Sequence, residues 1–162
     1  MSPNPLLAHA YTTARKLVHL MVDDLTEDEW LHQPVPGSNC AAWIVGHLTL
    51  ITRGALLRNR VHGLPDFPAD LKAKVTATSQ IAGEQLGFGD TKELLALFDA
   101  HIEAYTSWVG SVTEEALAKE PGTKVPFSTT LAEAIQFGAM HIAMHTGQLT
   151  IIRRSLGKPP LF

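Results

Sequence analysis

Apolar residues recur every three or four positions along four long stretches of the sequence, a spacing that places them on one face of an α-helix. The stretches cover about residues 5–23, 39–60, 91–112 and 131–156. In the third of them, for example, Leu94, Phe98 and Ile102 form such a stripe, and the second carries Ile51 and Ala55 on its stripe. Amphipathic helices bury these stripes by packing against one another. We therefore predict an all-α fold in which four helices form a four-helix bundle.

Local signals mark the ends of these helices. Asp90 followed by Glu93 is typical of a helix N-terminus, and Thr130 followed by Glu133 has the spacing of a capping box. Gly157, with prolines shortly after it, is typical of a helix C-terminus. The segment TKVPFST between the last two helices is short and contains a proline, which favours a loop over a strand.

Two segments of similar sequence precede the second and fourth helices. LTEDEWLHQPVPG and VTEEALAKEPG each carry Thr-Glu near the start and Pro-Gly at the end. Thr26, Glu27 and Pro34 match Thr113, Glu114 and Pro121 at a constant spacing. The match indicates two similar helical hairpins, which together would make the bundle.

The long irregular stretch is 61–89, which glycines and prolines interrupt. These are Gly63, Pro65, Pro68, Gly83, Gly87 and Gly89. Connections of this length inside a compact domain are often functional. We expect this stretch to cover a pocket at the end of the bundle.

The composition fits one globular domain, which we place at 1–162. Hydrophobic residues make up 45% of the chain, enough for a sizeable core, and the net charge is -3 at pH 7. Because nothing in the sequence forms a concentrated basic patch, we expect no nucleic-acid partner. No run approaches the roughly 18 apolar residues that span a membrane, and no apolar signal core leads the chain. We therefore expect a cytoplasmic protein with no membrane partner.

Two local features have a structural explanation that we prefer to a functional one. Arg153, Arg154 and Lys158 form a basic cluster near the C-terminus, where cations offset the helix dipole. Cys40 is the only cysteine, which excludes an intrachain disulfide and a multi-cysteine zinc site. Cys40 could serve as a nucleophile, but its position at the start of a buried helical face favours a small core residue.

Three of the eight histidines are candidates for a metal site. His141 and His145 lie one helical turn apart, on the face that also carries Ile142 and Leu149, so both are expected to point inward. His47 shares the inward stripe of the second helix. Imidazoles on facing helices can converge on one ion. We predict that His47, His141 and His145 bind a divalent metal ion, and the alternative is three separate core histidines.

Imidazole ligands suit zinc, nickel, copper or iron, and of these we expect zinc or nickel. His101 also points roughly inward from the third helix, where a core histidine is favoured over a fourth ligand or an outer-shell contact. The remaining histidines fit surface or helix-end positions. They are His9, His19, His32 and His62.

The C-terminal segment TLAEAIQFGAMHIAMHTGQLTIIRRSLGKPPLF resembles the signature of the DinB/YfiT-like superfamily. The matching residues are His141, His145, Gly147, Gln148, Arg153, Arg154, Gly157 and the final prolines. The segment WLHQPVPGSNCAAWIVGHL is also similar to that superfamily, in which a Pro-Gly turn leads into a helix with one histidine, here His47. The resemblance covers almost the whole chain. One departure is Ile142, where related sequences often have glutamate.

The resemblance implies a four-helix bundle with unusual connectivity, a metal ion bound by the three matching histidines, and frequent homodimers. It also implies activities with low-molecular-weight thiols. Relatives include thiol S-transferases that use mycothiol, bacillithiol or glutathione, and a thiol-dependent maleylpyruvate isomerase.

Three functions follow as hypotheses. The first is a metal-dependent thiol S-transferase that acts with a low-molecular-weight thiol on a small electrophilic substrate. The second is a non-catalytic metal- or ligand-binding module, since the sequence shows no clear acid, base or nucleophile outside the histidines. The third, a metal-dependent hydrolase, is disfavoured because Ile142 stands where such enzymes place a general-base glutamate, and Glu133 lies two turns away. Arg153 or Arg154 could bind a substrate carboxylate, although a helix-end role is simpler.

Overall fold

The computed structural model of the chain describes residues 4–76 and 87–161, and all regular secondary structure in these ranges is helical. The helices are α1 (Asn4–Val22), α2 (Glu27–Trp30), α3 (Ala41–Arg58), α4 (Ala69–Lys74), α5 (Thr91–Ser111), α6 (Glu114–Leu117) and α7 (Leu131–Ser155). The four long helices correspond to the four periodic stretches, so the all-α prediction is confirmed. None of the helices in the described part of the chain combines the length and apolar character needed to cross a bilayer.

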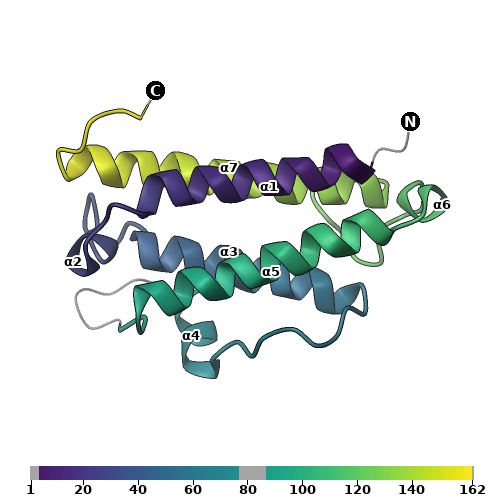
Figure 1. The fold of residues 1–162 in the computed structure, drawn as a ribbon, viewed down its shortest axis with the longest axis horizontal. Helices are drawn as coiled ribbons and strands as arrows, with labels where there is room; N and C mark the ends of the chain where they lie inside the picture. The colour runs from purple at the N-terminus through teal and green to yellow at the C-terminus, as the bar shows by residue number, and fades with distance from the viewer. Residues whose placement is uncertain (1–3, 77–86, 162) are drawn as a thin grey trace.

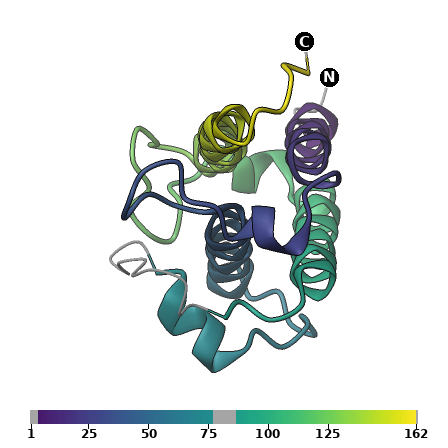
Figure 2. The ribbon, with the colours of Figure 1, turned by 90° about the vertical axis from the view of Figure 1, so that its left-hand side faces the viewer.

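The four long helices lie side by side (Figure 1). α1 and α7 run in one direction, and α3 and α5 run in the other. Seen along their axes, α1 lies between α5 and α7, and α3 contacts the same two helices from the opposite side (Figure 2). Each long helix therefore packs against one parallel and one antiparallel neighbour.

The expected capping residues begin two of these helices. The Asp90 carboxylate accepts hydrogen bonds from the backbone N–H groups of Lys92 and Glu93 at the start of α5. Thr130 and Glu133 form the predicted capping box at the start of α7, each side chain accepting from the other residue's backbone N–H. These bonds satisfy N–H groups that have no partner inside the helix.

The two Thr-Glu segments form the short helices that connect the long ones. Thr26 caps α2 by accepting a hydrogen bond from the backbone N–H of Glu29. Thr113 caps α6 in the same way, accepting from the backbone N–H of Ala116. The repeated sequence therefore corresponds to a repeated structural unit between α1 and α3 and between α5 and α7.

The core lies between the four long helices and takes side chains from each of them. Val18, Ile44, Phe98 and Leu149 represent α1, α3, α5 and α7, and all four are fully buried. Burying a side chain of this kind contributes about 1.5–3 kcal/mol. Cys40 is also buried, just before α3, and burial raises the pKa of its thiol. The prediction of a small buried core residue is therefore confirmed.

The basic cluster at the end of α7 has a packing role that the sequence did not indicate. Arg153 is only 4% exposed, and its guanidinium donates to the Met21 carbonyl oxygen and pairs with the Asp24 carboxylate. Lys158 pairs with Asp24 and Glu29. These contacts attach the end of α7 to the chain that leaves α1, whereas the sequence suggested a solvated helix end.

Polar contacts also connect α1 to α5. Asp99 accepts a hydrogen bond from Arg15 at 2.7 Å and lies 2.9 Å from Nε2 of His19. The other ring nitrogen of His19 contacts Asp23. These contacts raise the pKa of His19, although its partial burial acts in the opposite direction.

Candidate metal centre

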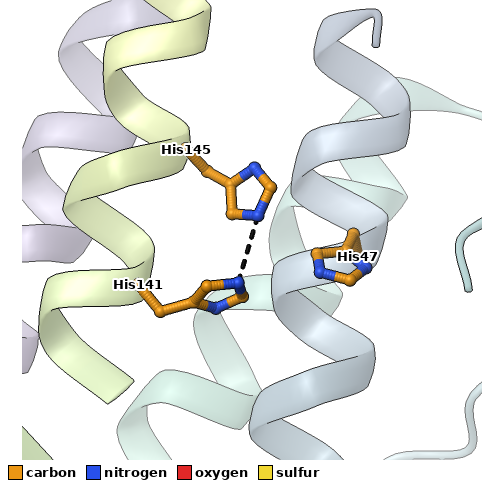
Figure 3. A group of neighbouring side chains, drawn as sticks. All are labelled: His47, His141 and His145. Atoms are coloured by element: carbon orange, nitrogen blue, oxygen red, sulfur yellow. Dashed lines mark hydrogen bonds between the residues drawn. The ribbon is translucent and has the colours of Figure 1, made fainter. Parts of the chain in front are cut away.

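The structure brings together the three histidines that the sequence selected. His47 projects from α3, while His141 and His145 project from α7 across the space between the helices (Figure 3). Their ligand nitrogens all lie within 4.8 Å of one another. Within the described part of the chain, the group consists of these three histidines and includes no carboxylate or thiol.

Hydrogen bonds from outside the group set the tautomers of two imidazoles. Nδ1 of His47 lies 2.9 Å from the carbonyl oxygen of Val75, which can only accept, so Nδ1 carries the proton. Nδ1 of His145 lies 3.1 Å from Oε1 of Gln148, an oxygen that also accepts a hydrogen bond from the Asn39 amide. In both rings Nε2 then carries the lone pair that can bind a metal ion, and such outer contacts are typical of histidine ligands.

The spacing of the ring nitrogens suits a single ion. Nε2 of His141 and Nε2 of His145 are 3.2 Å apart. Two nitrogens that each lie about 2.0–2.1 Å from one tetrahedral zinc ion are separated by about 3.3 Å. The donor set of three neutral imidazoles, the tautomers and this distance therefore fit a divalent metal ion.

The electrostatics of the group favour neutral rings. Burial lowers the pKa of each of the three imidazoles, that of His145 to about 4. The neighbouring imidazoles lower the pKa values of His141 and His145 further. The lowered pKa values favour neutral imidazoles, each with one protonated ring nitrogen and one nitrogen lone pair, as metal ligands must be.

Two neighbours hold the His47 ring in place. The indole of Trp43 stacks on it, with ring centroids 4.7 Å apart and an interplanar angle of 7°. Gly46 allows the chain after α4 to approach α3, because a Cβ atom at this position would lie 2.9 Å from the Val75 side chain. That approach brings the Val75 carbonyl within hydrogen-bond distance of His47.

A cavity of about 500 Å³ opens beside the histidines. His47 and His141 are among its lining residues, which come from α1, α3, α5 and α7 and from the segment before α7. The segment 121–126 covers it, whereas the described parts of 61–89 contribute no lining residue. The expectation that 61–89 covers the pocket is therefore wrong for its described part, and residues 77–86 lie outside that part. Val75, which belongs to this stretch, instead accepts a hydrogen bond from the His47 ring.

Comparison with protein families agrees with this architecture. Residues 10–149, which make up most of the chain, match the family model of the DinB superfamily. The chain belongs to the DinB superfamily. No curated protein matches it.

In this DinB-superfamily chain the residue that follows the first histidine of α7 is not acidic. Ile142 is buried there and lines the cavity. Glu133 does not supply a carboxylate there instead, because its carboxylate accepts hydrogen bonds from Thr129 and Thr130 at the start of α7. The site therefore offers no described carboxylate as a general base.

The other histidines lie outside the group, as predicted. His101 is fully buried in α5, where Nδ1 donates to the Leu97 carbonyl oxygen and Nε2 faces the Arg53 guanidinium at 3.3 Å. Arg53 also donates to the Pro65 carbonyl oxygen. His101 is therefore a core histidine that connects α5, α3 and the chain after α3.

Sequence reasoning missed several residues of the site in this DinB-superfamily protein. Tyr11 and Tyr105 line the cavity from α1 and α5, and their rings stack with centroids 4.4 Å apart. Arg58 lines it from the end of α3. Arg58 follows His47 by eleven positions on one helical face, and this spacing was an available signal. Nothing in the sequence pointed to the tyrosines, because they come from two other helices.

Proposed function

We propose that this protein is a divalent-metal-dependent thiol S-transferase that joins a low-molecular-weight thiol to a small electrophile. The observation that carries the proposal is the group of His47, His141 and His145, whose metal-binding nitrogens meet at the end of a cavity of about 500 Å³. Cavities of this size hold small molecules. Membership of the DinB superfamily, whose known members include thiol transferases, supports the same function.

The chain's own residues supply a site for the reaction rather than a nucleophile. A divalent ion held by the three imidazoles would deprotonate a thiol that coordinates it. In the overall reaction a bond would form between the thiol sulfur and the electrophilic carbon, the leaving group would depart with the bonding electrons, and the thiol proton would pass to solvent. Val75 and Gln148 keep two of the rings in the required tautomer, and Ile142 and Leu48 form an apolar wall beside the site. Because Cys40 is buried and has a raised pKa, an external thiol is the simpler nucleophile.

On this proposal the metal is zinc or nickel, and the four packed helices are the four-helix bundle of the DinB/YfiT type. The parallel pairs α1–α7 and α3–α5 support that assignment, because a simple up-and-down bundle would give antiparallel neighbours. The domain then corresponds to the whole chain, 1–162.

The first experiment is elemental analysis of the purified protein beside His47→Ala and His141→Ala, with His62→Ala as an exposed-histidine control. We expect about one equivalent of a divalent metal in the parent and the control, and loss of it in both site variants. A parent that stays metal-free after incubation with zinc and nickel salts would refute the proposal. Fluorescence of Trp43, which stacks on His47, gives an independent readout of metal binding.

The second experiment separates a transferase from the alternative of a non-catalytic binding module. That alternative is favoured by the absence of a described carboxylate from the histidine group. Cobalt-substituted protein is titrated with glutathione, and new thiolate-to-cobalt absorption shows thiol binding. Turnover of an aryl halide with the same thiol, lost in His141→Ala, supports the transferase. Thiol binding without turnover across a panel of electrophiles supports the module, and ester cleavage without thiol supports a hydrolase.

A further inference from the structure

Two basic side chains line the cavity besides the histidines. Arg58 lines it from the last turn of α3, and Lys124 lines it from the covering segment 121–126. No described residue that lines the cavity is acidic, although the whole chain has 16 acidic and 13 basic residues. The cavity therefore concentrates positive charge in a chain whose net charge is -3.

The Arg58 side chain lies back along α3 toward the histidines. A Cβ atom at Gly54 would lie 3.2 Å from Nη1 of Arg58, so the guanidinium rests against the helix at that glycine. Gly54 follows His47 by seven residues, which is two helical turns on the same face and about 10 Å along the axis. The guanidinium and His47 thus lie on one side of α3, about two turns apart.

Arg58 differs from the arginines that hold the fold together. Arg15 pairs with Asp99, Arg53 donates to Pro65, and Arg153 pairs with Asp24. For Arg58, by contrast, the described part of the chain offers neither a hydrogen bond nor an ion pair to the guanidinium. An arginine without a protein partner at the edge of a cavity is available to bind an anionic ligand, and its planar fork matches a carboxylate.

The space between the two ends is lined mainly by apolar and aromatic side chains. Ile51 and Ala55 form its floor on α3, and Tyr11, Tyr105 and Phe137 form its walls. The cavity therefore suits a molecule with an apolar middle, one end that reaches the histidines and an anionic group at the other end.

We infer that the cavity binds an acidic small molecule whose carboxylate pairs with Arg58 while its reacting group lies beside His47 and His141. This inference rests on the proposed function and names the chemical class of its substrate. On this inference the carboxylate is bound by Arg58 and not by Arg153 or Arg154, the two candidates that the sequence offered. Arg153 is buried in an ion pair, and Arg154 is exposed near the end of α7 and does not line the cavity.

The test compares ω-mercaptohexanoate with ω-mercaptohexanol, which share a thiol and a chain but differ in the terminal charge. Extended, mercaptohexanoate spans most of the roughly 10 Å between the histidines and the guanidinium. Both compounds are titrated into cobalt-substituted parent protein, Arg58→Gln and Arg154→Gln, with thiolate-to-cobalt absorption as the readout. Arg58 is exposed, so Arg58→Gln should fold normally.

We expect the acid to bind about tenfold more tightly than the alcohol in the parent and in Arg154→Gln, and equally tightly in Arg58→Gln. The alcohol should bind all three proteins alike. Equal affinity for acid and alcohol in the parent would overturn the inference and leave the proposed function intact, because both thiols would still bind the metal.

A second titration, without metal, tests the binding of the carboxylate separately from the proposed metal-dependent function. Sodium hexanoate and hexanol are added to metal-free protein, and the side-chain Nε–H signal of Arg58 is followed by NMR. A shift with hexanoate alone supports the inference even if the metal experiments fail. No shift with either compound overturns it, whatever the metal experiments show.

Discussion

The position of Tyr11 leaves no room for a side chain at Gly138 in α7, and this lack of space gives a testable prediction. An ideal Cβ atom on Gly138 would lie 1.9 Å from Oη of Tyr11 and 3.2 Å from its Cζ. Ordinary van der Waals contact begins near 3.4 Å, so the phenol would have to move by about 1.5 Å in Gly138→Ala (3.4 − 1.9). That movement breaks the buried hydrogen bond from Tyr11 to the Ile135 carbonyl oxygen and disturbs the stacking on Tyr105.

The size of the effect follows from three contributions. Leaving the buried hydroxyl without its partner costs about 1–3 kcal/mol, and overpacking costs about 1–3 kcal/mol. Replacing glycine by alanine inside a helix offsets this by about 1 kcal/mol. We therefore expect Gly138→Ala to lower the free energy of unfolding by about 3 kcal/mol, measured by urea denaturation.

Two controls isolate the cause. Gly147 lies in the same helix, and a Cβ atom there meets nothing within 4 Å, so Gly147→Ala should stabilise the protein by about 0.5–1 kcal/mol. Tyr11→Phe removes the oxygen responsible for the close approach. In that background Gly138→Ala should be nearly neutral, which corresponds to a coupling energy of at least about 2 kcal/mol between the two sites. Equal losses in the Tyr11 and Phe backgrounds, or stabilisation by Gly138→Ala alone, would refute the reasoning.

Three further predictions concern polar contacts. Gln148→Leu removes the hydrogen-bond acceptor that orients His145, and zinc affinity measured with a competing chelator should fall about tenfold. The folded-state pKa of His19 is raised above 6.5, so its stabilising contribution is present below that pH and is lost as the pH rises through the folded value. His19→Gln should therefore reduce the free energy of unfolding more at about pH 5.5 than at about pH 8.5, and an equal reduction would contradict the assignment. Arg153→Ala should lower the free energy of unfolding by about 1–3 kcal/mol in urea denaturation, because it leaves the buried Met21 carbonyl oxygen without its donor. Arg154→Ala, at an exposed position, should change the free energy of unfolding by less than about 0.5 kcal/mol.

The positions of the long helices were predictable because local chemistry marks them. Asp90 and the pair Thr130–Glu133 cap helices in the structure as the sequence indicated, and most residues of the apolar stripes are buried between the helices. The histidine group was predictable for a related reason. His141 and His145 share a helical face, and any inward residue of α3 at a similar depth can meet them.

The surroundings of the histidines were not predictable in the same way. The carbonyl of Val75 orients His47 from a segment 28 residues farther along the chain. A backbone oxygen has no side-chain signature, so the only trace of this contact in the sequence is Gly46, which permits the close approach. The cavity cover at 121–126 likewise depends on how a loop folds over two helices, which periodicity does not encode.

The incorrect part of the α3 prediction is itself informative about the site. The spacing placed Ile51 and Ala55 on the buried stripe with Ile44, but Ile51 is 43% exposed. Ile44 is fully buried in the core, whereas Ile51 lines the cavity that segment 121–126 also lines. Ile51 is therefore an apolar residue at core spacing that lines the cavity instead of filling the core. The stripe continues to Arg58, which is charged where a core position would be apolar. One face of α3 therefore changes along its length from core packing, through His47, to a floor that ends in a guanidinium. This gradient supports the proposed pairing of a metal-binding histidine with an acidic ligand.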